Sequence, residues 1–161
     1  MEPNAMPSTT LIRAASADDV ARIRAIARAA YAKYVSRLGH EPAPMAADYE
    51  AEVTARHVVV LEVDGEVDGY MVAWPEADAY FIDNIGVEPS RQGAGLGRRL
   101  LDYAAAEAER LQLPALRLYT NVVMAENLSM YVHLGFVETH RAVEKGFKRI
   151  YLLRNLAKPE R

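Results

Sequence analysis

Three glycines spaced two residues apart give one stretch of this chain the chemistry of an anion-binding turn. Gly93, Gly95 and Gly97 leave the main chain almost bare, which permits positive φ and lets a ligand touch backbone N–H groups directly. From Leu96 onward, apolar residues recur at spacings of three and four, which predicts a helix over residues 96–111. Because a helix that begins in such a turn has unpaired N–H groups and a positive dipole end, we expect it to bind phosphate.

Two common phosphate-binding loops do not fit this turn. The P-loop ends in Gly-Lys-Ser/Thr, whereas Gly97 is followed by Arg98 and Arg99, so no hydroxyl is present to bind magnesium. The dinucleotide fingerprint Gly-x-Gly-x-x-Gly is not matched either, because the third glycine comes too early. The sequence therefore indicates a phosphate-binding turn of another kind.

The elements that must position this turn alternate between strand-like and helix-like patterns. Pro89 ends the apolar run that precedes the turn, since it has no backbone N–H for a central strand. The strand-like runs cover residues 11–14, 57–63, 66–74, 79–87, 114–121, 136–143 and 147–153. The helical patterns cover residues 20–34, 46–54, 96–111 and 125–134. The order β-α-α-β-β-β-α-β-α-β-β predicts a mixed α/β (α+β) fold.

The composition is that of one ordinary globular domain. The chain has 161 residues, 51% hydrophobic and 25% charged, and we expect a single domain over residues 11–156. Residues 1–10 are expected to be a disordered leader, and residues 157–161 a tail. With no cysteine, the chain can form no disulfide and has no thiol nucleophile, which is compatible with a cytoplasmic location.

Several classes of partner are disfavoured by charge and patterning. The net charge of −3 gives no basic field for nucleic acid or an anionic membrane surface. The longest apolar run, residues 58–61, is far shorter than the roughly 18 residues that cross a bilayer. The four histidines have no metal-binding spacing, so we expect no metal.

The segment around the glycines resembles the acetyl-coenzyme A loop of the GNAT superfamily of N-acetyltransferases. That loop has the pattern Gln/Arg-x-x-Gly-x-Gly/Ala, which Gln92, Gly95 and Gly97 fill. The resemblance extends over residues 11–155 and includes the order of the elements. It implies a GNAT-like three-layer fold with helices on both faces of a mostly antiparallel sheet, splayed to hold the coenzyme where the strand that ends at Val87 parts from the strand that starts near Ala115.

The resemblance also implies roles for individual residues. The backbone of Ile85 and Val87 would pair with the pantetheine arm, and one N–H there would polarise the thioester carbonyl, as in an oxyanion hole. Tyr131 would protonate the coenzyme A thiolate, although its helical spacing also fits a packed core tyrosine. The residues expected to bind acetyl-coenzyme A are Ile85, Gly86, Val87, Gln92, Gly93, Ala94, Gly95, Leu96, Gly97, Arg98 and Asn127.

An amine with a pKa near 10.4 must lose a proton before it attacks, so a general base is expected. Asp83 is the first candidate, because it is an ionisable side chain within the apolar run that enters the turn. A paired strand carboxylate is the alternative interpretation of that residue. The other candidate bases are Glu126, His133, His40 and Glu41.

Taken together, these features predict an enzyme that transfers acetyl from acetyl-coenzyme A to a primary amine of a small molecule or peptide, by direct attack in a ternary complex. A coenzyme A sensor without catalysis is the alternative. A homodimer is possible. Four aromatic residues could form a wall for the acceptor or belong to the core: Tyr31, Tyr34, Trp74 and Tyr80.

Overall fold

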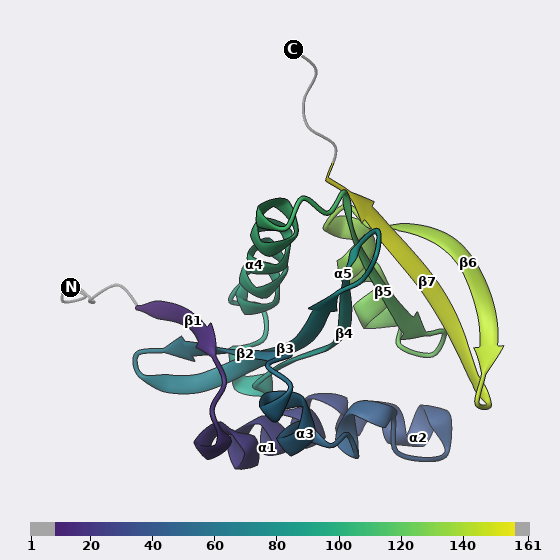
Figure 1. The fold of residues 1–161 in the computed structure, drawn as a ribbon. Helices are drawn as coiled ribbons and strands as arrows, with labels where there is room; N and C mark the ends of the chain where they lie inside the picture. Colours follow the sequence, from purple (N-terminus) through teal and green to yellow (C-terminus); the bar gives the residue numbers. More distant parts are fainter. Residues whose placement is uncertain (1–8, 157–161) are drawn as a thin grey trace, which may run out of the picture.

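One mixed sheet runs through the molecule, with helices on both of its faces (Figure 1). The computed structural model describes residues 9–156. The strands follow the order β1-β2-β3-β4-β5-β7-β6, and every neighbouring pair is antiparallel except β4 and β5. Their bounds are β1 (Thr10–Ala14), β2 (Val58–Val63), β3 (Glu66–Pro75), β4 (Tyr80–Val87), β5 (Ala115–Asn121), β6 (Val137–Glu144) and β7 (Phe147–Asn155).

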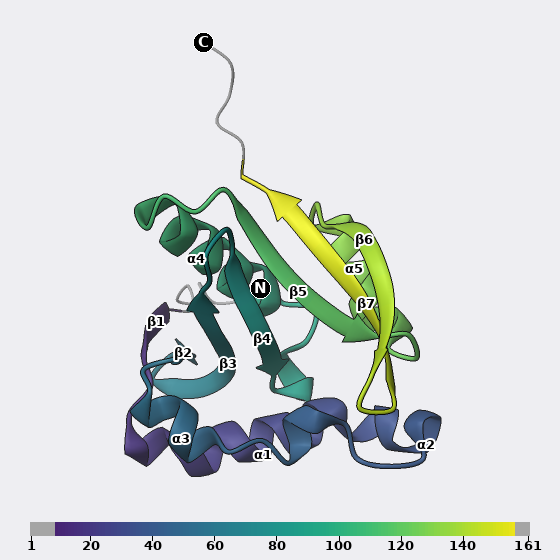
Figure 2. The same cartoon turned by 45° about the vertical axis from the view of Figure 1, so that its right-hand side comes forward.

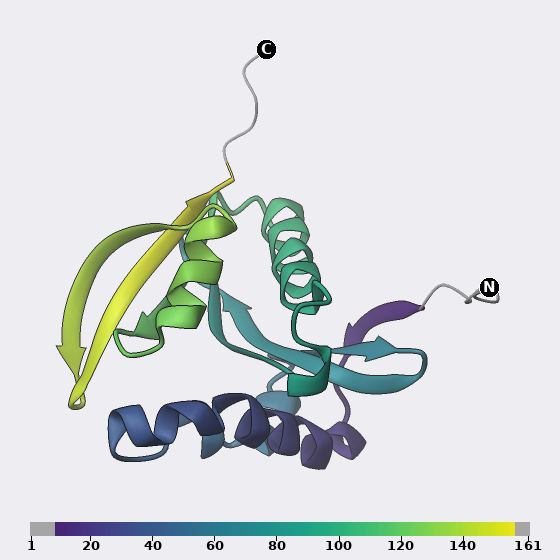
Figure 3. The ribbon, with the colours of Figure 1, turned by 180° about the vertical axis from the view of Figure 1, so that it is seen from behind.

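The helices lie in two groups on opposite sides of the sheet. Helices α1, α2 and α3 run along one side, and α4 and α5 cover the other (Figure 1, Figure 3). Their bounds are α1 (Val20–Tyr31), α2 (Val35–Leu38), α3 (Tyr49–Thr54), α4 (Leu96–Arg110) and α5 (Ala125–His133). No helix among residues 9–156 is long and apolar enough to cross a membrane. The expected three-layer α/β arrangement is confirmed.

Two tight turns fix the register of the hairpins. Asp64 and Gly65 have φ of 52° and 85°, and Lys145 and Gly146 have φ of 52° and 81°. Positive φ at both central residues is the mark of a type I′ turn, whose twist suits two antiparallel strands. The second turn is one residue tighter than the sequence predicts, because Glu144 still belongs to β6.

Two boundaries differ from the sequence prediction. The first strand begins at Thr10, inside the expected leader, because β1 is paired with β2 from that residue onward. Residues 1–8 of the leader and the tail, residues 157–161, lie outside the described residues. Helix α3 begins at Tyr49 and not near Ala46, because the Asp48 side chain accepts the Ala51 N–H at 3.0 Å and caps the helix there.

A separate hydrophobic core lies on each face of the sheet. On one face, Leu96, Leu100 and Ala104 of α4 pack against β3, β4 and β5. On the other, Ile23 and Ala27 of α1 pack with residues of α3, β2 and β3. Both helices therefore bury the apolar stripes that their sequence periodicity predicts.

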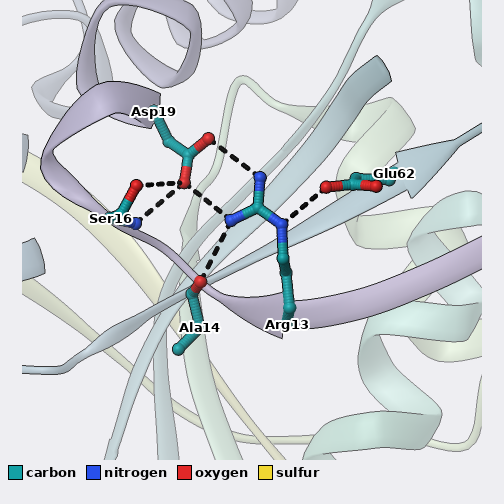
Figure 4. A network of polar contacts seen from close by, with 5 residues as sticks. All are labelled: Arg13, Ala14, Ser16, Asp19 and Glu62. Carbon is teal, nitrogen blue, oxygen red and sulfur yellow. Dashed lines mark hydrogen bonds and ion pairs between the residues drawn. The ribbon is translucent and has the colours of Figure 1, made fainter. Parts of the chain in front are cut away.

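A polar network ties the edge strand β1 to the start of α1, as Figure 4 shows. The Arg13 guanidinium donates to both carboxylate oxygens of Asp19, at 2.8 and 3.0 Å, and to Glu62 at 2.5 Å. Asp19 also accepts the Ser16 N–H at 2.8 Å, which closes a capping box. The Arg13 hydrogen bonds lower the pKa of Asp19. This network fixes the entry into α1, the helix that ends at Tyr31.

The sheet divides where β4 and β5 meet. Only Tyr80 to Ile82 of β4 pair with Leu116 to Leu118 of β5, and beyond those residues the two strands diverge (Figure 2). The parallel pairing is thus confined to three residue pairs. The splay that the resemblance implied is confirmed, and it opens one side of β4 over Asp83 to Val87.

Candidate active site

A cleft of about 550 Å³ lies where β4 leaves β5, between the start of α4 and helix α5. Nearly all the residues expected from the sequence to bind the coenzyme line it, and Tyr131 lies on its wall. Those residues are Ile85, Gly86, Val87, Gln92, Gly93, Gly95, Leu96, Gly97, Arg98 and Asn127. Ala94 is the exception: it does not line the cleft, and its N–H donates to the Arg91 carbonyl at 3.3 Å.

The glycine turn has the backbone conformation that its sequence predicts. Gly93 and Gly95 have φ of 88° and 82°, in the left-handed region that favours glycine. Gly95 caps α4, and the first helical bond runs from the Arg99 N–H to the Gly95 carbonyl at 3.1 Å. The N–H groups of the first helical turn therefore have no partner within the helix, and the positive end of the helix dipole lies at the cleft.

A buried carboxylate, Asp68, holds the residues that precede this turn. Asp68 of β3, whose side chain is only 5% exposed, accepts from Arg91 at 3.0 Å and from Arg22 of α1 at 3.1 Å. Its backbone carbonyl accepts the Glu88 N–H at 2.8 Å. The residues that lead into the glycine turn are thereby tied to β3 and α1. No local sequence pattern predicts this anchor, because Asp68 lies 23 residues before Arg91 in the chain.

The open side of β4 presents backbone groups to the cleft. The Tyr31 hydroxyl donates to the Ile85 carbonyl at 2.8 Å, and Tyr31 itself lines the cleft. A strand residue directs its N–H and C=O toward the same side, so the Ile85 N–H also points toward the cleft. Gly86 is required by packing: a Cβ there would lie 2.3 Å from the Tyr70 ring.

A second, smaller pocket of about 140 Å³ adjoins the cleft. Tyr31, Asn127 and Tyr131 line both cavities, so the two meet at these side chains. Asp83 and Arg149 line only the smaller pocket. The candidate acid and the candidate base are therefore brought to one place, although they are far apart in the sequence.

Tyr131 occupies the junction as a buried phenol. Its side chain is 6% exposed, and its ring packs edge-on against Phe136 with the centroids 5.7 Å apart. Burial raises the pKa of Tyr131 above its ordinary value, so the hydroxyl keeps its proton at neutral pH. A protonated phenol at this junction has the properties of a general acid.

Asp83 is held in surroundings that favour its protonated form. Burial raises the pKa of Asp83, and the negative charge of Glu52 adds to that rise. Two groups partly offset this rise. The Asn84 side chain donates to the Asp83 carboxylate at 3.2 Å, and this hydrogen bond and the positive charge of Arg149 both lower the pKa of Asp83. A carboxylate whose pKa is moved toward neutrality is suited to accept a proton.

A family model, the Acetyltransferase (GNAT) domain, matches residues 54–138. The chain belongs to the GNAT acetyltransferase family. It is 26% identical to yncA of Salmonella typhimurium, a structure with its cofactor acetyl-CoA, over 93% of this chain and 95% of that one (TM-score 0.65).

Two further solved structures share the GNAT fold. The ribosomal-protein-S18-alanine N-acetyltransferase of Escherichia coli is 19% identical, with 94% of this chain and 97% of that one covered and a TM-score of 0.75. The PaiA N-acetyltransferase of Thermoplasma acidophilum, in complex with coenzyme A, is 14% identical, with 91% and 99% covered and a TM-score of 0.72. These likenesses confirm the fold.

The other candidate bases of this GNAT domain are less well placed. Glu126 pairs with Arg37 at 2.6 Å, and these hydrogen bonds lower the pKa of Glu126 to about 2, so it is a poor base. His40 and Glu41 line neither cavity, and His133 lines only the larger one. No group of three metal-binding side chains lies together in the part of the chain that the structure describes.

The four aromatic candidates separate in the structure. Tyr31 lines both cavities, and Tyr34 lines only the larger cleft, where its buried hydroxyl has no partner among the described residues. Trp74 and Tyr80 line neither cavity; Tyr80 belongs to the core beneath α4. The periodicity of the sequence does not separate pocket-lining from core aromatic residues, because the position of the cavities depends on which strands diverge.

Proposed function

We propose that this GNAT domain transfers an acetyl group from acetyl-coenzyme A to a primary amine of a small molecule or peptide. The observation that carries the proposal is the meeting of two cavities at Tyr131, with Asp83 in the smaller one. The larger cleft suits the coenzyme, and the smaller pocket suits the amine. Because the cavities adjoin, donor and acceptor can react directly in a ternary complex without a covalent enzyme intermediate.

The larger cleft has features that fit the coenzyme. The unpaired N–H groups of Leu96, Gly97 and Arg98, at the positive end of α4, fit a pyrophosphate. The outward backbone of Ile85 and Val87 offers the pantetheine arm the hydrogen bonds of an added strand. Asn127, which lines both cavities, is placed to contact the arm near its reactive end.

The chemistry is divided between three parts of the site. When bound, acetyl-coenzyme A supplies an acetyl thioester. The Ile85 N–H is placed to stabilise negative charge on the carbonyl oxygen, a role worth about 3–4 kcal/mol for one donor. Asp83 accepts the proton of the attacking amine, and Tyr131 donates a proton to the departing sulfur.

Incubation with acetyl-coenzyme A and a panel of amines tests the proposal. The chain has no cysteine, so a thiol reagent reports only the coenzyme A that is released. We expect amine-dependent thiol release together with an acetylated product found by mass spectrometry. Calorimetric binding of coenzyme A without turnover of any amine would instead establish the sensor.

A further inference from the structure

An arginine of the β6–β7 hairpin, Arg149, lines the smaller pocket together with Asp83, the proposed general base. The Arg149 side chain is 17% exposed, and its guanidinium lies 4.2 Å from the centroid of the Tyr119 ring, in cation–π contact. The centroid of the Phe147 ring, also on β7, lies 5.9 Å from the guanidinium. The charge is thus held at the pocket by aromatic surfaces on two sides.

Most of the hydrogen-bonding capacity of Arg149 is unused by the protein. Its Nη1 donates to Glu144 at 3.1 Å, the Tyr151 hydroxyl is a second hydrogen-bond partner, and no further acceptor for the guanidinium is found among residues 9–156. A guanidinium has five N–H donors in a planar fork, which matches the two oxygens of a carboxylate. The remaining donors are therefore available to an anionic group in the pocket.

Asp83 and Arg149 both line the pocket but do not bind each other. The positive charge of Arg149 lowers the pKa of Asp83, so the two groups are within electrostatic reach. No ion pair joins them. The pocket therefore presents a carboxyl group and a guanidinium that do not pair with each other, and a molecule with an amine and an acid fits that pattern of charge.

The rest of the pocket limits the size and character of its ligand. The volume of about 140 Å³ is well below the roughly 300–1,000 Å³ of drug-sized ligand sites. Much of the wall is apolar, from the segment after α2, from β5 and β7, and from the start of α5. The apolar residues include Leu38 at the end of α2, Pro42, Pro44, Leu118, Met124 and Phe147.

We propose that the acceptor is a free α-amino acid with an apolar side chain, its amine directed toward Asp83 and Tyr131 and its carboxylate bound by Arg149. This inference rests on the proposed acetyl transfer and narrows its acceptor. A peptide amine lacks a carboxylate next to its amine, so Arg149 would gain no charged partner from it.

The first test compares leucine and methionine with their carboxamides, in which a neutral amide replaces the carboxylate. Hydrogen bonds to charged groups contribute about 1.5–3 kcal/mol, so kcat/KM should favour the free acids by about 10- to 150-fold. Equal use of acids and carboxamides, or a preference for peptide amines, would overturn the assignment.

Substitution of Arg149 shows whether this residue makes the distinction. Arg149→Met keeps an apolar stem and should abolish the preference for the free acids, measured within the variant as the ratio of kcat/KM for leucine to kcat/KM for its carboxamide. Arg149→Lys should keep part of the preference. The control is Arg141→Met on β6, since Arg141 is 58% exposed and lines neither cavity. An unchanged preference in a folded Arg149→Met variant would refute the assignment.

Binding separates this inference from the acetyl transfer on which it rests. Calorimetric titration of the protein saturated with coenzyme A should show leucine binding that the Arg149→Met variant loses. If leucine binds in this way but no amine is acetylated, the proposed reaction fails and the amino-acid pocket stands. If carboxamides are acetylated and leucine does not bind, the reaction stands and the pocket assignment fails.

Discussion

Replacement of Asp83 by asparagine should change stability and activity in opposite directions. Asparagine keeps the shape of the side chain and still offers an oxygen to Asn84, which donates to Asp83 at 3.2 Å. It removes the charge that burial disfavours. The substitution therefore isolates the ionisable proton site from the packing around it.

The stability change follows from the direction of the pKa shift. The folded-state pKa of Asp83 is raised above the ordinary value of 3.8, so the folded protein binds the proton more tightly than the unfolded chain does. Stability is consequently lost as the pH rises from about 3.8 through the folded-state pKa, and the loss is complete above that pKa. Each unit of the shift amounts to about 1.4 kcal/mol. Asp83→Asn should recover that free energy, and each kcal/mol raises the melting temperature by about 2–4 °C.

The activity change is expected to be large. Loss of a general base typically costs about 10²- to 10⁴-fold in rate, or about 2.7–5.4 kcal/mol in the activation free energy. The wild-type kcat/KM should fall as the pH drops below the raised pKa of Asp83, and the variant should lack that limb. Thiol release across a pH series and a thermal melt at pH 7 measure both quantities.

Asp78→Asn is the matched control. The Asp78 side chain is 69% exposed in the β3–β4 loop and pairs with Arg117 at 3.2 Å, so both activity and melting temperature should stay near wild type. An Asp83→Asn variant that is less stable than wild type, or that keeps its activity and pH profile within about twofold, would refute the role of Asp83 as a buried base.

Three other substitutions probe the cleft. Tyr131→Phe removes only a hydroxyl, so turnover should fall about 10²- to 10⁴-fold with acetyl-coenzyme A affinity unchanged; turnover within twofold of wild type would return Tyr131 to the core. Gly95→Val places a branched residue at a φ of 82°, so calorimetry should show coenzyme A affinity reduced more than about tenfold in a folded protein, and wild-type affinity would exclude this turn as the phosphate site. Asp68→Asn loosens Arg91 beside that turn, so coenzyme A affinity and the unfolding free energy should both fall, the latter by about 1–3 kcal/mol; unchanged values would show that the anchor is dispensable.

The sequence predicts those parts of the fold that depend on local chemistry. Asp64-Gly65 predicts a type I′ hairpin, and the glycines of the turn predict positive φ, because few other residues adopt these conformations. The start of α3 is harder to predict, since it depends on the Asp48 side chain accepting the Ala51 N–H, whereas Ala46 and Ala47 before it also favour a helix. Local patterns therefore give the elements more reliably than their ends.

The parts of the site that depend on strand register could not be predicted. Arg149 meets the Tyr119 ring because β7 pairs with β5 in one particular register, with Tyr119 opposite Tyr151. A shift of one residue would turn Arg149 to the other face of the sheet. The Asp68 anchor likewise needs β3 beside β4 and α1, which no pattern within one segment encodes.

The short contact between β4 and β5 makes the two halves of the sheet mechanically separable. Beyond Ile82 and Leu118, neither facing edge has a strand partner across the gap, so separation along this line breaks few backbone hydrogen bonds. A ligand whose own amide groups pair with β4 would act as a missing strand and join the halves. Occupancy at a hundred times the dissociation constant adds about 2.7 kcal/mol to the free energy of unfolding. The supply of acetyl donor would then set both how fast the protein works and how well it resists unfolding and proteolysis.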